Sequence, residues 1–219
     1  MSRDVTGVVP AESRSAWLAF ASIIVWVAAA ASTGRLGIWV ALGGASVALG
    51  AAVLLFDRPA ATALLRPSSR LVLVGAVAGG LMAAATYLLY PTLARILPFV
   101  PTDAARLYAA FRAPPPIIAS VALVPVVVGE ELVWRGVVQT SLVRRFGAWR
   151  GVTLAAVAYA LVHAPLGSPV LVAVAFICGL AWAALRATTA SLIPGLVAHL
   201  LWDLVVLLWL PLDRPPTLR

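Results

Sequence analysis

The sequence predicts an all-α protein, a polytopic transmembrane helical bundle of about seven spans. Of its 219 residues, 63% are hydrophobic and 11% are charged, whereas a soluble domain carries roughly 25% charged residues. This composition excludes a disordered chain and argues against an ordinary soluble domain. The length suits one compact bundle, at roughly 20 residues per span plus short loops.

Each expected span is an apolar segment, read as helix because a lipid-exposed backbone must satisfy its hydrogen bonds within the segment. The segments cover residues 16–31, 36–56, 71–93, 117–140, 151–164, 169–185 and 190–209. The fifth and sixth are short for a span. We therefore expect them to be tilted, buried in the bundle or lengthened by their loops.

The first segment also has features of a signal peptide. Arg3 and Arg14 precede it, and the small residues Ser32-Thr33-Gly34 follow it. The tryptophans within it, Trp17 and Trp26, and the membrane character of the remaining chain favour an uncleaved first span.

Residues 94–116 carry several charges and end in three prolines, Pro114 to Pro116. We expect an interfacial segment with a short amphipathic helix that the prolines terminate.

All 16 basic residues are arginines, and the formal net charge is +8. Because they lie mainly between apolar segments, they indicate loop charge and lipid headgroup contacts rather than nucleic-acid binding. With seven spans, nine arginines fall on the side of the N-terminus and of the loops near 57–70, 141–150 and 186–189, and six fall on the other. The positive-inside rule places the first side in the cytoplasm.

A few ionisable residues lie inside apolar segments, where a charge costs about 2.5–3.5 kcal/mol and so marks a candidate functional site. They are Glu130, Glu131, Arg135, His163, His199 and Asp203. The lone Cys178 has no neighbour in sequence that would stabilise a thiolate, so we interpret it as a packed thiol.

The spacing of these residues predicts one polar site. Glu131 and Arg135, Tyr159 and His163, and His199 and Asp203 are each four residues apart, so each pair shares one helix face. Measured from the same membrane face, Glu130, His163 and His199 all lie roughly 15–18 Å deep. We interpret Glu131 and Arg135 as a structural ion pair.

Two hydrolytic mechanisms fit these groups. A carboxylate beside a neutral imidazole can take a proton from water, and a second imidazole can stabilise an oxyanion, which suits amide hydrolysis. Glu130, His163 and His199 could instead bind zinc with an open position for water. The residues leave both mechanisms open.

The ordered motifs resemble those of the CAAX-protease and bacteriocin-processing (CPBP or Abi) family of intramembrane proteases, which includes the CAAX prenyl endoprotease. Glu130-Glu131-Leu-Val-Trp-Arg135 resembles its E-E-x-x-x-R motif, Tyr159-Ala-Leu-Val-His163 its F-x-x-x-H motif, and His199-Leu-Leu-Trp-Asp203 its H-x-x-x-N/D motif. The resemblance covers about residues 117–209. It divides the chain into N-terminal helices with the interfacial segment (1–115), a catalytic core (116–210) and a short tail (211–219).

The resemblance implies roles for these residues. Glu130 would activate water with the help of His163, while His199 and Asp203 would stabilise the oxyanion. Glu131, Arg135 and Tyr159 would support the site. Two residues depart from the family pattern: Tyr159 replaces Phe, and Asp203 stands where the prenyl endoprotease has Asn. An ionised Asp203 cannot donate to an oxyanion, so it must be protonated or hold His199 as imidazolium.

The expected function is therefore that of an intramembrane endopeptidase in a bacterial cytoplasmic membrane. Its substrate would be a membrane-associated protein or peptide, cut at a leader, a prenylated end or a C-terminal sorting segment. Beyond the zinc of the alternative mechanism, no cofactor is expected. The rival interpretations are a non-catalytic membrane scaffold and an immunity or partner-binding protein. A small transporter would favour inverted repeats, and none is apparent.

Overall fold

The computed structural model describes residues 11–213, and every regular element within them is a helix. This confirms the predicted fold class. The α-helices are α1 (Ala11–Leu36), α2 (Gly44–Phe56), α3 (Arg58–Leu64), α4 (Ser69–Ile96), α5 (Phe99–Phe111), α6 (Pro116–Glu131), α7 (Gln139–Phe146), α8 (Ala148–Leu161), α9 (Pro169–Thr189) and α10 (Ile193–Trp202). Wider π-helical turns form η1 (Trp39–Gly43), η2 (Leu132–Val138) and η4 (Asp203–Trp209), and η3 (Ala164–Leu166) is a 3-10 turn.

Within the described residues, 5 helical stretches are long and apolar enough to cross a membrane. They are Ala16–Leu36, Trp39–Phe56, Ser69–Ile96, Pro116–Phe146 and Pro169–Thr189, and Ile193–Trp209 is a shorter apolar helix. Each of the seven predicted segments lies mainly on helical residues, the fifth of them on α8. The sixth is lengthened by its loop to the 21 residues of α9, whereas the fifth remains a helix of 14 residues.

The predicted fifth helix was too long at its C-terminal end. It ends at Leu161 rather than at residue 164, so His163 lies in the turn that follows α8. Pro165 and Gly167, which has a φ of +71°, explain the early end because neither residue favours continuation of an α-helix.

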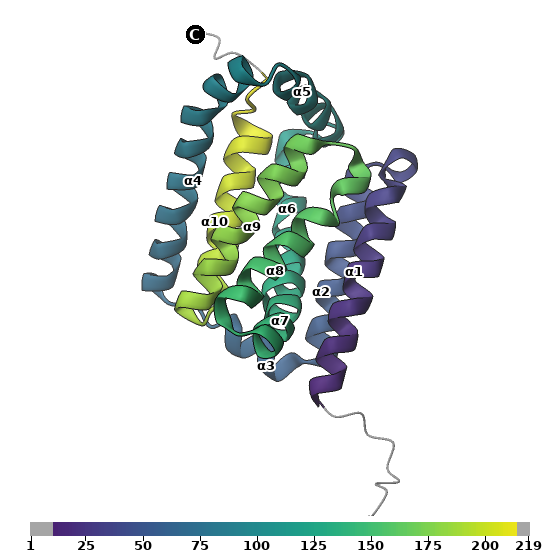
Figure 1. The fold of residues 1–219 in the computed structure, drawn as a ribbon, viewed down its shortest axis with the longest axis vertical. Coiled ribbons are helices and arrows are strands. Elements are labelled where there is room, and N and C mark those ends of the chain that lie inside the picture. Colours follow the sequence, from purple (N-terminus) through teal and green to yellow (C-terminus); the bar gives the residue numbers. More distant parts are fainter. Residues whose placement is uncertain (1–10, 214–219) are drawn as a thin grey trace, which may run out of the picture.

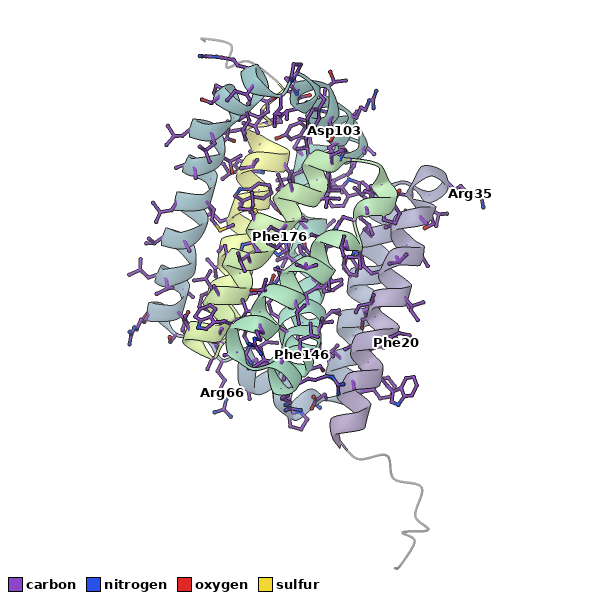
Figure 2. The ribbon with its side chains drawn as sticks, in the orientation of Figure 1. Phe20, Arg35, Arg66, Asp103, Phe146 and Phe176 are labelled. Atoms are coloured by element: carbon purple, nitrogen blue, oxygen red, sulfur yellow. The ribbon has the colours of Figure 1, made fainter. Side chains whose placement is uncertain are left out.

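The bundle has two distinct ends, shown in Figure 1. One end carries α3 and the connection between α7 and α8, and the other carries α5 and the last described residues. Figure 2 labels Arg66 and Phe146 at the first end and Asp103 near the second. The loops assigned to the arginine-rich side thus share one end. Arg3, Arg214 and Arg219, also used for the orientation, lie outside the described residues.

Helix α5 is the short helix expected between the third and fourth segments, and it is tied to the rest of the bundle. The buried carboxylate of Asp103 accepts hydrogen bonds from Ser168 Oγ (2.7 Å) and Val170 N (3.0 Å) at the start of α9. Tyr108 donates to the carbonyl oxygen of Val206 (2.9 Å), and burial raises the pKa of Tyr108 to about 12. Arg112, just after the helix, forms an ion pair with Asp213. These contacts hold α5 across one end of the bundle.

The first helix is part of the packed bundle. Trp26 is fully buried, and its ring meets that of Trp134 edge to face at 5.6 Å between centroids. This packing joins α1 to η2 in the interior of the bundle.

Candidate active site

Five of the seven predicted site residues line a largely apolar cavity of about 360 Å³ inside the bundle, and Glu131 and Arg135 do not. Its walls come from η1, α4, α5, α6, α8, α9, α10 and η4, and its polar residues include Glu130, Tyr159, His163, His199 and Asp203. Along α6 the wall runs from Leu123 to Glu130, and along α9 it runs from Val170 to Trp182. The polar groups therefore gather toward one end of the cavity, and α5 lies at the other.

Glu130 stands in the last turn of α6, where the helix widens into the π-helical turn η2. Such turns occur frequently at functional sites. Tyr159 donates a hydrogen bond to Glu130 Oε2 at 2.7 Å, and His199 Nε2 lies 4.0 Å from the same oxygen. The carboxylate is thus held in place while one side of it faces the cavity.

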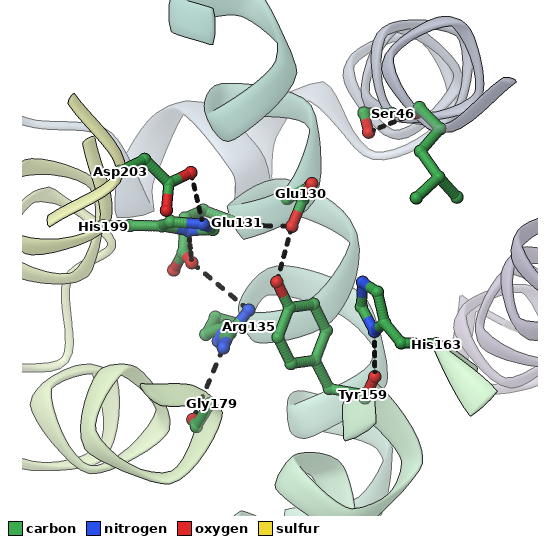
Figure 3. Close-up of polar contacts among 10 residues, drawn as sticks. Ser46, Glu130, Glu131, Arg135, Tyr159, His163, Gly179, His199 and Asp203 are labelled. Atoms are coloured by element: carbon green, nitrogen blue, oxygen red, sulfur yellow. Dashed lines mark hydrogen bonds and ion pairs between the residues drawn. The ribbon is translucent and has the colours of Figure 1, made fainter. Parts of the chain in front are cut away.

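Glu131 does not line the cavity and is completely buried. Its Oε1 lies 3.2 Å from Arg135 Nη1 and accepts a hydrogen bond of 2.9 Å from His199 Nδ1 (Figure 3). The Arg135 guanidinium lies over the ring of Tyr159, 4.5 Å from its centroid, and donates to Gly179 O at 3.4 Å. The expected ion pair therefore also contacts α8, α9 and α10, through Tyr159, Gly179 and His199.

His199 is held from three sides. Its Nδ1 faces Glu131, and its Nε2 lies 3.4 Å from Asp203 Oδ2. Its ring stacks on Trp182, with 3.6 Å between centroids and 16° between planes. Both ring nitrogens of His199 therefore face carboxylate oxygens, which can accept hydrogen bonds from them.

His163 has a defined tautomer. Its Nδ1 lies 2.7 Å from the carbonyl oxygen of Tyr159. Because a carbonyl only accepts, Nδ1 is the donor, and the neutral ring keeps a free lone pair on Nε2. Figure 3 shows the Tyr159 ring between Arg135 and His163. The structure thus gathers Glu130, Tyr159, His199 and Asp203 by direct contacts and adds His163 through Tyr159.

The same geometry bears on the zinc alternative. Among residues 11–213, no group of three or more His, Cys, Asp or Glu side chains is arranged to hold a metal ion. His163 is separated from Glu130 and His199 by Tyr159, whose ring lies 4.9 Å from that of His163 between centroids (Figure 3). The predicted ligand set of Glu130, His163 and His199 does not fit a zinc ion.

Sequence reasoning missed two aromatic contacts and one hydrogen bond of the site. Trp182 forms the surface on which the His199 ring stacks. Trp26 lies edge to face with His163 at 6.3 Å. The hydrogen bond between Glu131 and His199 joins separate helices. Spacing along one helix gives no signal for any of these contacts.

Comparison with known proteins agrees with the motifs. Residues 112–205 match the model of the family described as type II CAAX prenyl endopeptidase Rce1-like. No curated protein and no solved structure matches the chain. The matched region contains every residue of the three motifs and ends within η4. The apolar helices thus identify an integral membrane protein, and its residues 112–205 match the CAAX protease family.

Proposed function

We propose that the protein hydrolyses a peptide bond of a membrane-associated protein or peptide, using water activated by Glu130 and His163. The observation that carries this proposal is the placement of Glu130. Its carboxylate is fixed by Tyr159 toward one end of an apolar cavity and lies 4.0 Å from His199 Nε2. A carboxylate in such surroundings is suited to general-base catalysis.

In the proposed reaction, water attacks the carbonyl carbon of the scissile bond while Glu130 takes one of its protons. The free Nε2 of His163 accepts a hydrogen bond from the same water and orients it. The oxyanion that forms is stabilised by the imidazolium of His199, which Asp203 and Glu131 keep charged. Glu130 then passes the proton to the amide nitrogen, the carbon–nitrogen bond breaks, and a carboxylic acid and an amine are released.

The cavity indicates what the substrate presents to the site. Val170 and Trp182, at the two ends of the α9 wall, are 12 residues apart, which corresponds to roughly 18 Å along a helix. Most of this length is apolar. We therefore propose that an apolar part of the substrate, such as a prenyl group or a hydrophobic leader or sorting segment, occupies the cavity. The scissile bond would lie beside Glu130.

A test of this function compares the membrane proteins of cells that carry the wild-type protein with those of cells that carry Glu130→Ala, in what we expect to be a bacterial cytoplasmic membrane. The proposal predicts at least one membrane protein that keeps an uncut terminus only in the variant. The purified wild-type protein should then cut that terminus. Identical termini in both cells, together with normal insertion of the variant, would favour a non-catalytic scaffold.

A further inference from the structure

We infer that the N-terminal helices, which the family model does not cover, position the three groups proposed to perform the hydrolysis. Each group, or the residue directly before it, is contacted by a different helix of residues 11–111. Helix α2 touches the residue before Glu130, α4 touches the residue before His199, and α1 touches His163 itself. This inference rests on the proposed function, since it assigns positioning residues to that site.

At Glu130 the contact is between two backbones. A methyl group placed on Gly129 would lie 2.1 Å from the carbonyl oxygen of Ser46, and one placed on Gly50 would lie 2.5 Å from Gly129 Cα. No side chain fits between α2 and α6 at this crossing. Helix α2 therefore determines where the backbone that carries Glu130 lies.

At His199 the arrangement is similar. A methyl group on Gly79 would lie 2.9 Å from both the Cα and the carbonyl oxygen of Ala198. One turn further along α10, Trp202 Nε1 donates a hydrogen bond of 3.0 Å to Thr86 Oγ1 of α4. Helix α4 thus fixes α10 on both sides of His199.

At His163 the contact is aromatic. This residue lies between the end of α8 and the short 3-10 turn η3. Its ring is bounded by Tyr159 at 4.9 Å and by the fully buried Trp26 of α1 at 6.3 Å between centroids. Trp26 also packs on Trp134 at 5.6 Å, which fixes its own position. Loss of this indole would remove the support of the imidazole ring on the α1 side.

The expected size of the effect follows from the distances. An ordinary contact of a methyl carbon begins at 3.4 Å, so Gly79→Ala must separate α4 from Ala198 by several tenths of an ångström. A misplacement of about 1 Å at a catalytic group can cost about 100-fold in rate. We therefore expect roughly a tenfold loss of kcat, with little change in KM.

The chain supplies matched controls. Gly80 follows Gly79 on α4 and Gly44 begins α2, and a methyl group on either would meet nothing within 4 Å. Gly79→Ala is therefore compared with Gly80→Ala, and Gly50→Ala with Gly44→Ala. Trp26→Leu is compared with Trp26→Phe, which keeps an aromatic ring against His163. The three contacts are tested separately, so misfolding of one variant leaves the other two informative.

The first readout needs no substrate. The chain has 2 histidines, so the full-length protein, purified without a histidine tag and labelled with ¹⁵N-histidine, gives ring signals from His163 and His199 alone. Gly79→Ala should shift the signals of His199, Trp26→Leu those of His163, and the control variants neither. Unchanged spectra in both test variants would overturn the inference.

The second readout is turnover of a farnesylated, internally quenched peptide that ends in a CAAX sequence. Gly79→Ala and Gly50→Ala should each lower kcat by roughly tenfold and leave KM within about twofold, with Gly80→Ala and Gly44→Ala close to wild type. Wild-type kcat in both test variants would also overturn the inference. Should the wild type leave this peptide uncut while Gly79→Ala shifts the His199 signals, the failure belongs to the proposed activity on this probe, and the positioning inference is supported.

Discussion

Glu131 and His199 are 68 residues apart in the chain and share a hydrogen bond of 2.9 Å between Oε1 and Nδ1 in a fully buried position. The same oxygen faces Arg135 at 3.2 Å. One carboxylate therefore connects α6, η2 and α10, while its neighbour Glu130 faces the cavity. The two adjacent glutamates are therefore placed for different tasks. Glu131 holds Arg135 and His199 in position, whereas Glu130 faces the space proposed for the substrate.

Replacing Glu131 should mainly affect stability. In Glu131→Gln the buried Arg135 loses its anion, which costs about 3–5 kcal/mol. We expect a large fall in unfolding temperature, followed by tryptophan fluorescence in detergent. Glu130→Gln should keep the wild-type unfolding temperature, because Glu130 has no buried cation to neutralise within 3.5 Å. Equal destabilisation by the two variants would contradict this division.

Removing the Tyr159 hydroxyl should lower the rate without unfolding the protein. Tyr159→Phe keeps the ring over Arg135 but loses the hydrogen bond to Glu130 Oε2. A hydrogen bond to a charged group contributes about 1.5–3 kcal/mol, equivalent to roughly 10- to 100-fold in kcat at most. The family motif carries Phe at this position, so we expect a loss near the lower value. A loss as complete as that of Glu130→Gln would show that the hydroxyl takes part in the chemistry.

Replacing Asp203 with Asn should lower kcat less than replacing it with Ala. Its Oδ2 lies 3.4 Å from His199 Nε2, and the prenyl endoprotease has Asn at the matching position. Asp203→Asn keeps the shape of the side chain and provides a donor for the oxyanion, so kcat should stay within about tenfold of wild type. Asp203→Ala removes both the partner of His199 and any donor. If Asp203→Asn is as inactive as Asp203→Ala, the negative charge itself is required.

Chelators should not inhibit the enzyme, because the described residues do not bring Glu130, His163 and His199 together as a set of metal ligands. We expect full turnover of the quenched peptide after dialysis against EDTA and 1,10-phenanthroline, and a metal content far below one ion per chain. Inhibition that added zinc reverses would contradict the metal-free mechanism.

The fold class and the residues of the site could be predicted because both depend on local signals. Apolar runs fix the helices, and an ionisable residue inside such a run is conspicuous. The pairing of Glu131 with Arg135 also follows from spacing on one helix, and the structure has it at 3.2 Å.

The contacts between helices could not be predicted in the same way. Trp182 stacks on His199 only because α9 and α10 bring the two rings together, and nothing in the local sequence marks that tryptophan. His163 lies beyond the end of α8 because Pro165 and Gly167 end this helix earlier than its apolar sequence predicts. The glycine contacts of α2 and α4 depend on helix crossings, which a single sequence does not specify.

The most direct test of the account measures kcat of purified, folded Glu130→Gln beside wild type, Glu131→Asp and Cys178→Ser. Cys178 also lines the cavity, so Cys178→Ser controls for a mild change in its wall. We predict a loss of at least about 100-fold for Glu130→Gln, the lower end expected for a general base, with measurable turnover in the other two variants. Turnover by Glu130→Gln at the wild-type rate would contradict the assignment of Glu130 as the base.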